Sequence, residues 1–379
     1  MQRVLACLFC SLAFIASGCA QEPEQTNSSK PAAVGNSKSN STLGPNDAVG
    51  SDSATRYSAA HWSFANQQFA QINVDRRVPE GSDWTKFLGP QSNGSSLETG
   101  VDVALWDPHP PLNWVIPLGT SYGGPARVGN RLLLFDRFGD NERLSCFDTE
   151  SAQELWRSEM PVEYGDMYGY NNGPRCAPIV DNDLVFTYGV AGQLSCCQLK
   201  TGELVWTRNL NTEFGVVQNF FGVASSPYIF ENLLLVMVGG SPASSQSPSS
   251  SRIDLVEPNG TAVVAFDKKT GEERYRLGDD LASYASVAVE EIHGKPTGLA
   301  FLRSGLLAFD PLAGTECFTF PWRSSKFESV NAAMPVVTED QILLSECYEI
   351  GSVLLQIQDS GQPSILRQDE GRYRELSFR

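Results

Sequence analysis

Residues 263–275 read VVAFDKKTGEERY, and this stretch decides the fold. Its first four residues are apolar, which is typical of a short buried strand. Asp267 and Gly271 then carry turn chemistry, because an aspartate side chain hydrogen-bonds its own downstream backbone and glycine adopts positive φ at little cost. A second strand follows and reaches the ring of Tyr275. The stretch therefore predicts a β-hairpin that ends on a large side chain.

The same eleven-residue motif, small-x-Asp-x-x-x-Gly-x-x-x-aromatic, recurs along the chain. Copies run over residues 146–156, 196–206, 265–275 and 308–318, and a worn fifth copy runs over 355–365. Their last residues are Trp156, Trp206, Tyr275, Phe318 and, in the worn copy, Ile365. Repeats at such a period indicate a propeller, a solenoid or an array.

Two further apolar runs precede each hairpin. The first begins with a small residue or proline, at residues 124–126, 177–180, 226–229, 286–289 and 334–337. The second follows a polar turn, at residues 131–135, 184–187, 233–236 and 341–344. Four antiparallel strands in each unit of about 45 to 50 residues describe one blade of a β-propeller. We therefore predict an all-β propeller of four-stranded antiparallel blades, about five in number, over residues 83–368, with a charged tail at 369–379.

The phase of the repeat predicts that this propeller is incomplete. Trp114 is in phase with the other rings, but Asp107-Pro108-His109-Pro110-Pro111 stands where its hairpin partner would be. The prediction is a lone outer strand at Trp114 and five full blades, forming an open arc or a poorly closed ring. Exposed strand edges would follow, and such edges invite pairing.

The composition and net charge limit the kinds of partner that the chain is expected to bind. The 379 residues are 41% hydrophobic, enough for a large core, and carry a formal charge of −16. Phosphate binding needs clustered Lys and Arg, so we predict that the chain does not bind nucleic acid. The acidity itself is interpreted as an aid to solubility.

The first residues predict export and a lipid anchor. Arg3 precedes an apolar run to Ile15, and Ala16-Ser17-Gly18 lead into Cys19, so residues 1–18 have the anatomy of a secretory signal peptide. The small residues before Cys19 resemble a bacterial lipobox, which implies acylation of Cys19; the alternative is ordinary cleavage. Residues 19–82 then form the lipidated N-terminus and a linker rich in Ser, Asn, Gly and Pro. Within it, Trp62, Ala65, Phe69 and Ile72 fall near helical spacing, so a short docked helix is one interpretation and more linker is the other.

The opening of the repeat region resembles a known family. Residues 83–90, DWTKFLGP, with Asn93-Gly94, and residues 110–114, PPLNW, resemble the opening of secreted PQQ-like propeller proteins. This family, whose members have seven or eight blades, includes quinoprotein dehydrogenases and the propeller lipoprotein of the outer-membrane β-barrel assembly machinery. The resemblance implies that Trp114, Trp156, Trp206, Tyr275 and Phe318 are structural and pack between neighbouring blades.

A dehydrogenase of this family would hold PQQ over a calcium ion bound by Glu and Asn, often beneath a vicinal disulfide. Cys196-Cys197 is such a pair, but both residues lie within a predicted strand, where consecutive side chains point to opposite faces. We therefore interpret them as buried thiols. No run of oxygen ligands or haem-attachment motif is present in the sequence. No catalytic, cofactor or metal residue is assigned, and PQQ with calcium belongs to the alternative function.

Cys146 and Cys196 occupy the same motif position in adjacent blades, so we also expect them to lie near each other, either paired or as small buried residues.

Loops on one end of the propeller are the candidate recognition surface. Aromatic and amide side chains there suit binding; the candidates are Tyr164, Tyr168, Tyr170, Asn171, Asn172, Asn219, Phe220 and Phe221. Alternatively, the rings plug the funnel of the propeller.

Three functions remain open from the sequence. The first is a non-catalytic exported lipoprotein that binds or scaffolds other envelope proteins, held to the membrane by its lipid. The second is a PQQ-dependent dehydrogenase, and the third is a truncated, non-functional propeller copy.

Overall fold

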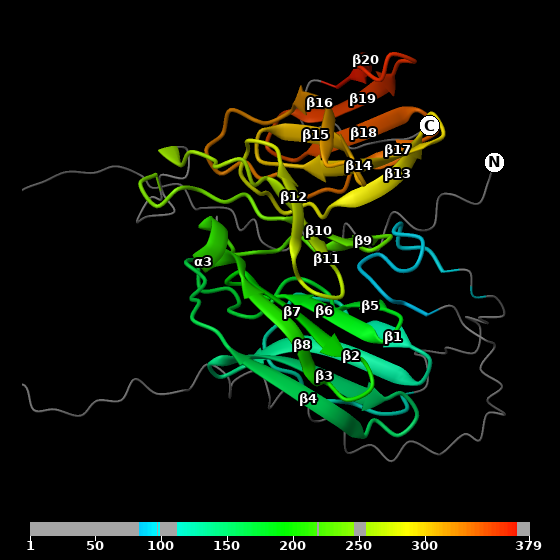
Figure 1. The fold of residues 1–379 in the computed structure, drawn as a ribbon, viewed down its shortest axis with the longest axis vertical. Helices are drawn as coiled ribbons and strands as arrows, with labels where there is room; N and C mark the ends of the chain where they lie inside the picture. The colour runs from blue at the N-terminus through cyan, green and yellow to red at the C-terminus, as the bar shows by residue number, and fades with distance from the viewer. Residues whose placement is uncertain (1–82, 97, 99–111, 218–219, 246–254, 370–379) are drawn as a thin grey trace, which may run out of the picture. The chain divides into compact units, whose positions relative to one another are not determined.

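The computed structural model describes residues 83–96, 98, 112–217, 220–245 and 255–369. The predicted signal peptide, the acylated Cys19, the linker with its Trp62–Ile72 helix, Asn219 and nearly all of the tail lie outside these residues. The described part of the chain contains five four-stranded antiparallel sheets, each with its strands in consecutive order (Figure 1). The predicted all-β architecture of about five blades is therefore confirmed.

Each sheet is one blade, and blades 1 to 5 follow the chain. Blade 1 comprises β1 (Ala126–Val128), β2 (Arg131–Phe138), β3 (Asn141–Asp148) and β4 (Glu154–Pro161). Blade 2 comprises β5 (Ile179–Asp181), β6 (Leu184–Tyr188), β7 (Gln193–Gln198) and β8 (Leu204–Asn209). Blade 3 comprises β9 (Tyr228–Phe230), β10 (Leu233–Met237), β11 (Val263–Asp267) and β12 (Glu273–Leu277). Blade 4 comprises β13 (Ala288–Ile292), β14 (Lys295–Phe301), β15 (Gly305–Asp310) and β16 (Thr315–Pro321). Blade 5 comprises β17 (Val336–Thr338), β18 (Gln341–Glu346), β19 (Gly351–Ile357) and β20 (Pro363–Gln368).

The repeated motif forms the hairpin between the third and fourth strand of each blade. The Oδ1 atom of Asp267 accepts hydrogen bonds from the backbone N–H of Lys269 and Thr270, at 2.9 and 3.0 Å. Asp148 and Asp310 make the equivalent bonds in blades 1 and 4. Because these hydrogen bonds are local, the motif forms the same turn in each of these copies with aspartate at its third position.

In blades 1 to 3, the ring at the end of the motif docks on the hairpin turn of the next blade. The indole Nε1 of Trp156 donates to the carbonyl oxygen of Leu199 at 3.0 Å, and that of Trp206 donates to Lys268 at 3.1 Å. Tyr275 repeats the contact with its hydroxyl, 2.6 Å from the carbonyl oxygen of Pro311. The ring also lies on the glycine of that turn: a Cβ atom at Gly202 would lie 2.3 Å from Trp156. Glycine is needed there for its lack of a side chain as well as for its positive φ.

Trp114 makes the same contact at the start of the array. Its Nε1 atom donates to the carbonyl oxygen of Thr149 in the blade 1 hairpin, at 2.9 Å. The prediction of a lone β-strand here is wrong, because residues 112–119 belong to no strand and the nearest pairing is a single bridge between Thr120 and Arg137. The indole hydrogen bond of Trp114, and not pairing with a neighbouring strand, therefore holds residues 112–119 against blade 1.

Apolar cores fill the space between neighbouring blades. Leu133 and Phe135 of blade 1 share a core with Val185 of blade 2. Phe186 of blade 2 shares the next core with Phe266 of blade 3. Two further cores join blade 3 to blade 4 and blade 4 to blade 5. Because the sheets of blades 2 to 4 contribute both faces to such cores, their buried strands are apolar on consecutive positions and not only on alternate ones.

Two local features complete the described fold. Trp84 pairs with Arg127 of β1, the carbonyl oxygen of Thr85 accepts from Val180 of β5 at 2.7 Å, and Lys86 lies over the ring of Tyr228 of β9. The opening motif thus lies against the inner strands of blades 1 to 3. A short helix that the sequence did not predict, α3 (Leu210–Phe214), follows β8 and is capped by the Asn209 side chain.

Candidate binding site on the loop face

The loop face is the end of the propeller where the fourth strand of one blade leads to the first strand of the next. It comprises residues 162–178, 210–217, 220–227, 278–287 and 322–335, together with the described residues of the loops between second and third strands. These loops touch each other across blades: the N–H of Val223 donates to the carbonyl oxygen of Val190 at 2.9 Å, and that of Tyr284 donates to Asn331 at 3.0 Å. The loop face is therefore one connected surface.

An aromatic cluster runs across this face. Tyr168 and Tyr170 stack with ring centroids 5.8 Å apart, and Phe221 lies 5.6 Å from Tyr168 and 6.5 Å from Tyr170. Phe221 in turn lies 5.6 Å from Tyr284, and the neighbouring Phe220 packs edge-on against Phe327, also at 5.6 Å. The six rings come from the four loops that join successive blades. Aromatic pairs at these separations attract one another beyond their area of burial.

The inner part of the cluster is fixed to the propeller. The hydroxyl oxygen of Tyr284 accepts hydrogen bonds from the backbone N–H groups of Phe220 and Phe221, at 3.0 and 2.8 Å. Burial raises the pKa of Tyr284, so the hydroxyl stays neutral. Beneath the rings lies a small core of Val256, Leu281 and Val330. The cluster therefore has a rigid base.

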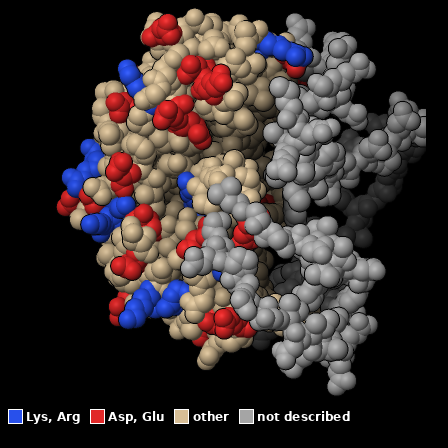
Figure 2. All heavy atoms as spheres, turned by 90° about the vertical axis from the view of Figure 1, so that its right-hand side faces the viewer, with Lys and Arg blue, Asp and Glu red and all other residues tan. Residues whose placement is uncertain are grey.

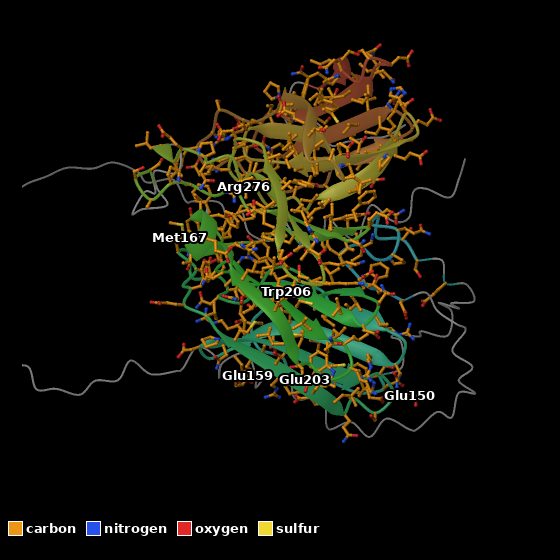
Figure 3. The ribbon with its side chains drawn as sticks, in the orientation of Figure 1. Glu150, Glu159, Met167, Glu203, Trp206 and Arg276 are labelled. Atoms are coloured by element: carbon orange, nitrogen blue, oxygen red, sulfur yellow. The ribbon has the colours of Figure 1, made fainter. Side chains whose placement is uncertain are left out.

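The outer part of the cluster is open to solvent. Tyr170 exposes 67% and Tyr168 49% of its surface. Met167, which Figure 3 labels, is also 49% exposed. Tyrosine and methionine are enriched at protein interfaces, where they supply large contact area at low entropic cost. The exposed rings thus form the part of the cluster that is able to meet a partner.

The remaining predicted recognition residues hold the loop in place. The Oδ1 atoms of Asn172 and Asn171 accept from the backbone N–H groups of Asp166 and Gly173, at 2.7 and 2.8 Å. Asp166 pairs with Arg175 at 2.8 Å, and the Arg175 guanidinium lies 5.5 Å from the centroid of the Tyr164 ring. The side chains of Asp166 and Arg175 are buried, so this pair and its neighbours fix the shape of the loop.

An open depression of about 790 Å³ adjoins the loop that carries the exposed tyrosines. Its lining comes from blade 1, blade 2 and the loop between them: Arg137, Asp140, Pro161, Val162, Glu163, Tyr164, Gly165 and Asn209. The guanidinium of Arg137 is largely buried and donates to the carbonyl oxygens of Tyr164 and Asn172. Asp140 and Glu163 expose their carboxylates at the rim. The Arg137 guanidinium is therefore occupied by hydrogen bonds within the fold, whereas the Asp140 and Glu163 carboxylates are exposed to solvent.

A buried carboxyl lies beneath the loop face. An oxygen of Glu142 accepts the backbone N–H of Val190 at 2.7 Å, which links blade 1 to blade 2. Burial raises the pKa of Glu142 to about 7, although the hydrogen bond and the nearby Arg137 and Arg175 oppose the rise. This group changes charge near neutral pH.

The cysteines occupy separate cores. Cys196 packs in the core between blades 2 and 3, and Cys197 packs in the core between blades 1 and 2. The expectation that Cys146 lies near Cys196 is wrong, since Cys146 shares its core with Cys197 instead. Residues at equivalent positions face the same way around the propeller and so do not face each other.

Two observations bear on the calcium-quinone site that the family resemblance implies. Among residues 83–369, in the ranges given above, no three His, Cys, Asp or Glu side chains gather as a metal site. The adjacent cysteines point into different cores and do not form a platform. The loop face presents aromatic rings and exposed carboxylates.

Charge on the described surface is mixed. Figure 2 shows acidic and basic side chains interspersed over the visible face, without a broad basic patch among the described residues. No helix in the described part of the chain is long and apolar enough to cross a membrane.

The sequence did not single out Tyr284 and Phe327 as site residues. Each belongs to a loop without the run of aromatics that singled out residues 164–172 and 220–221. Their position in the sequence could have identified them, because both lie in the stretch that leads into the first strand of the next blade.

Comparison with known proteins agrees with this architecture. A family model described as outer membrane protein assembly factor BamB matches residues 140–375. Among solved structures, BamB from Moraxella catarrhalis is 15% identical, with 68% of this chain and 64% of that chain covered and a TM-score of 0.44. A quinohemoprotein alcohol dehydrogenase from Comamonas testosteroni is 12% identical, with 75% of this chain and 52% of that chain covered and a TM-score of 0.53, which shows a common fold.

The chain therefore spans less than two thirds of the length of either protein. None of the curated proteins compared matches the sequence. The family match covers more than half of the chain and includes all five hairpin motifs. The chain belongs to the PQQ-like propeller family of the outer membrane protein assembly factor BamB.

Proposed function

We propose that the protein is a non-catalytic binding module of the cell envelope, whose protein partner docks on the loop face. The observation that carries this proposal is the aromatic cluster, in which exposed Tyr168 and Tyr170 stand on a base fixed by Tyr284. Exposed aromatic residues on a rigid base are the usual anchors of protein interfaces. Membership in the BamB family supports an envelope role.

The rigid base favours binding because little order has to be created when a partner arrives. Phe220 and Phe221 are already held by two hydrogen bonds, and the 163–172 loop is fixed by the buried Asp166–Arg175 pair. Preorganisation of this kind reduces the entropic cost of association.

Attachment to the membrane is proposed through an acylated Cys19. The small residues before Cys19 motivate this part of the proposal. A single acyl chain binds a bilayer weakly, whereas the two acyl chains of a diacylglyceryl group give a stable anchor. Replacing Cys19 with serine should move the protein from the membrane pellet to the soluble envelope fraction. Retention of the serine variant in a carbonate-washed pellet would contradict the anchor.

Co-purification tests the binding role. The full chain is isolated from crosslinked envelopes as wild type, as Tyr168→Ser/Tyr170→Ser, and as Leu312→Ser, which alters an exposed residue in the β15–β16 hairpin turn, away from the loop face. We expect the same partner with wild type and with Leu312→Ser, and at least a tenfold loss with the tyrosine variant, as for removal of interface anchors. Equal recovery by all three would contradict docking on the loop face.

A PQQ-dependent dehydrogenase remains the alternative and has a direct test. PQQ and Ca²⁺ are added to the purified chain, followed by measurement of bound-quinone absorbance and dye reduction with alcohols. We expect neither signal at micromolar protein. A stoichiometric quinone spectrum with dye reduction would replace the binding role by an oxidoreductase.

A further inference from the structure

The charges around the aromatic cluster indicate which kind of partner the loop face accepts. Asp140 and Glu163 stand at the rim of the depression on the blade 1 side, next to the loop that carries Tyr168 and Tyr170. Glu328 and Glu349 are exposed on the blade 5 side, next to Phe327 and Tyr348 of the same aromatic group. Carboxylates therefore flank the cluster on both sides.

The arginines of the same face are turned inward. Arg137 donates to backbone carbonyls, Arg175 pairs with Asp166 and lies against Tyr122 and Tyr164, and Arg303 is buried beneath Phe220. Each is occupied within the fold, and their side chains lie below the surface. Lys326 is exposed, but its ammonium group lies 2.6 Å from a Glu349 oxygen. Arg323 is half-buried and donates to the carbonyl oxygen of Phe327 at 3.4 Å. Among the described residues of this face, exposed carboxylates therefore outnumber exposed cations.

Asp140 is the carboxylate best placed to change partner on binding. Its side chain is fully exposed, and its contact with Arg137 is long, at 4.0 Å. An exposed pair at that distance contributes little, so a new cation is able to compete for this carboxylate. Glu163 lines the same depression, whose open volume exceeds what one guanidinium or ammonium group needs.

We propose, on the basis of the proposed binding function, that the loop face recognises a cationic segment of a partner protein. An arginine or lysine enters the depression between Asp140 and Glu163, and an apolar side chain beside it covers the rings of Tyr168, Tyr170 and Phe221. Exposed tyrosine faces add cation–π attraction for a second basic residue. Rim carboxylates also speed the approach of such a partner and make its binding sensitive to salt.

A displayed library of random twelve-residue peptides tests this proposal even though the partner is unidentified. The full chain is immobilised, and peptides that also bind Tyr168→Ser/Tyr170→Ser are removed. The selected peptides are synthesised, and their affinities are measured by fluorescence anisotropy at low and high NaCl. The charge variant is Asp140→Asn/Glu163→Gln, and its matched control is Glu272→Gln/Glu316→Gln, which neutralises two exposed carboxylates of blades 3 and 4 away from the loop face.

We expect peptides rich in Arg or Lys next to an apolar residue. Their affinity should fall roughly tenfold in the Asp140/Glu163 variant, fall with salt, and stay unchanged in the Glu272/Glu316 control. Selected peptides without basic residues, or with affinities indifferent to Asp140 and Glu163, would overturn the cationic partner and leave the proposed binding face standing. If no peptide prefers wild type over the tyrosine variant, the binding face itself is wrong.

Discussion

The hydroxyl oxygen of Tyr284 lies 2.8 Å from the backbone nitrogen of Phe221 and accepts its hydrogen bond. Tyr284 belongs to the loop between blades 3 and 4, and Phe221 to the loop between blades 2 and 3. This contact joins two blades at the loop face and sets the position of the ring on which Tyr168 and Tyr170 rest. The aromatic cluster is therefore part of the fold and not a set of independent surface side chains.

Replacing Tyr284 with phenylalanine should destabilise the protein. The change leaves the N–H groups of Phe220 and Phe221 without their acceptor, at a cost of about 1 to 3 kcal/mol. Urea unfolding would measure the loss, and hydrogen exchange at these two amides would localise it. Tyr170→Phe is the control, because its exposed hydroxyl should change stability by less than about 0.5 kcal/mol. Equal stability of the two variants would contradict the anchoring role of Tyr284.

The docking of rings on glycines predicts unequal effects of the same substitution. Gly202 and Gly361 occupy equivalent hairpin positions, with φ of 75° and 81°. A Cβ atom would meet the Trp156 ring at Gly202 and nothing within 4 Å at Gly361. Both alanine variants bear the cost of left-handed backbone, about 1 to 2 kcal/mol, and Gly202→Ala bears a further overpacking cost of about 1 to 3 kcal/mol.

Thermal and urea unfolding of the two glycine variants gives the comparison. Gly361→Ala is the internal control for backbone strain, so the difference between the variants reports the Trp156 contact alone. If Gly361→Ala destabilises the chain as much as Gly202→Ala, the rings do not dock between blades as described.

The buried Glu142 predicts a fall in stability as pH rises. Its pKa is raised in the folded protein to about 7, against the usual 4.5, so the folded state binds the proton more tightly than the unfolded state. Stability is therefore highest below about pH 4.5 for this group and is lost as pH rises toward 7, by on the order of 3 kcal/mol. Glu142→Gln, which cannot ionise, should flatten the dependence between pH 5 and 8.

Urea titrations across that range, with the exposed Glu163→Gln as control, provide the measurement. The control should keep the wild-type slope. A Glu142→Gln variant whose stability tracks wild type at each pH would show that the carboxyl does not titrate while buried.

The separate cores of the cysteines predict two classes of thiol. Cys317 and Cys347 are exposed, whereas Cys146, Cys176, Cys196 and Cys197 are buried, and burial raises the pKa of Cys196 to about 12. A soluble maleimide should label the first two quickly and the other four only on unfolding. Mass spectrometry of labelled peptides would assign them. A Cys196–Cys197 disulfide in the unlabelled protein would contradict their placement on opposite faces.

Much of the fold was accessible from sequence because the motif is local. Asp267 and Gly271 form their turn from bonds within a few residues, and the ring of Tyr275 follows at a fixed distance along the next strand. The same pattern located the hairpin between the third and fourth strand of each blade. The short helix α3 was missed although Asn209 provides a capping residue, because five residues carry no periodic signal.

The candidate site was accessible only in part because it depends on contacts between blades. Tyr168 and Phe221 can be recognised in the sequence as aromatic residues in loops. The contacts of Tyr284 and Phe327 with the aromatic cluster depend on how neighbouring blades pack. The expectation for Cys146 and Cys196 failed for the related reason that equivalent residues share a direction. Conversely, Asn171 and Asn172 looked like recognition residues and instead bond to the backbone of their own loop.

Photo-crosslinking at position 170 tests the binding face most directly. A photoreactive phenylalanine replaces Tyr170, which is 67% exposed, and a second protein carries it at Leu312, which is 58% exposed on the hairpin turn of blade 4. After irradiation of intact cells, we expect a discrete adduct with one envelope protein from position 170, lost on adding Tyr168→Ser, and none from position 312. Adducts of equal yield from both positions, or none from position 170, would contradict a partner on the loop face.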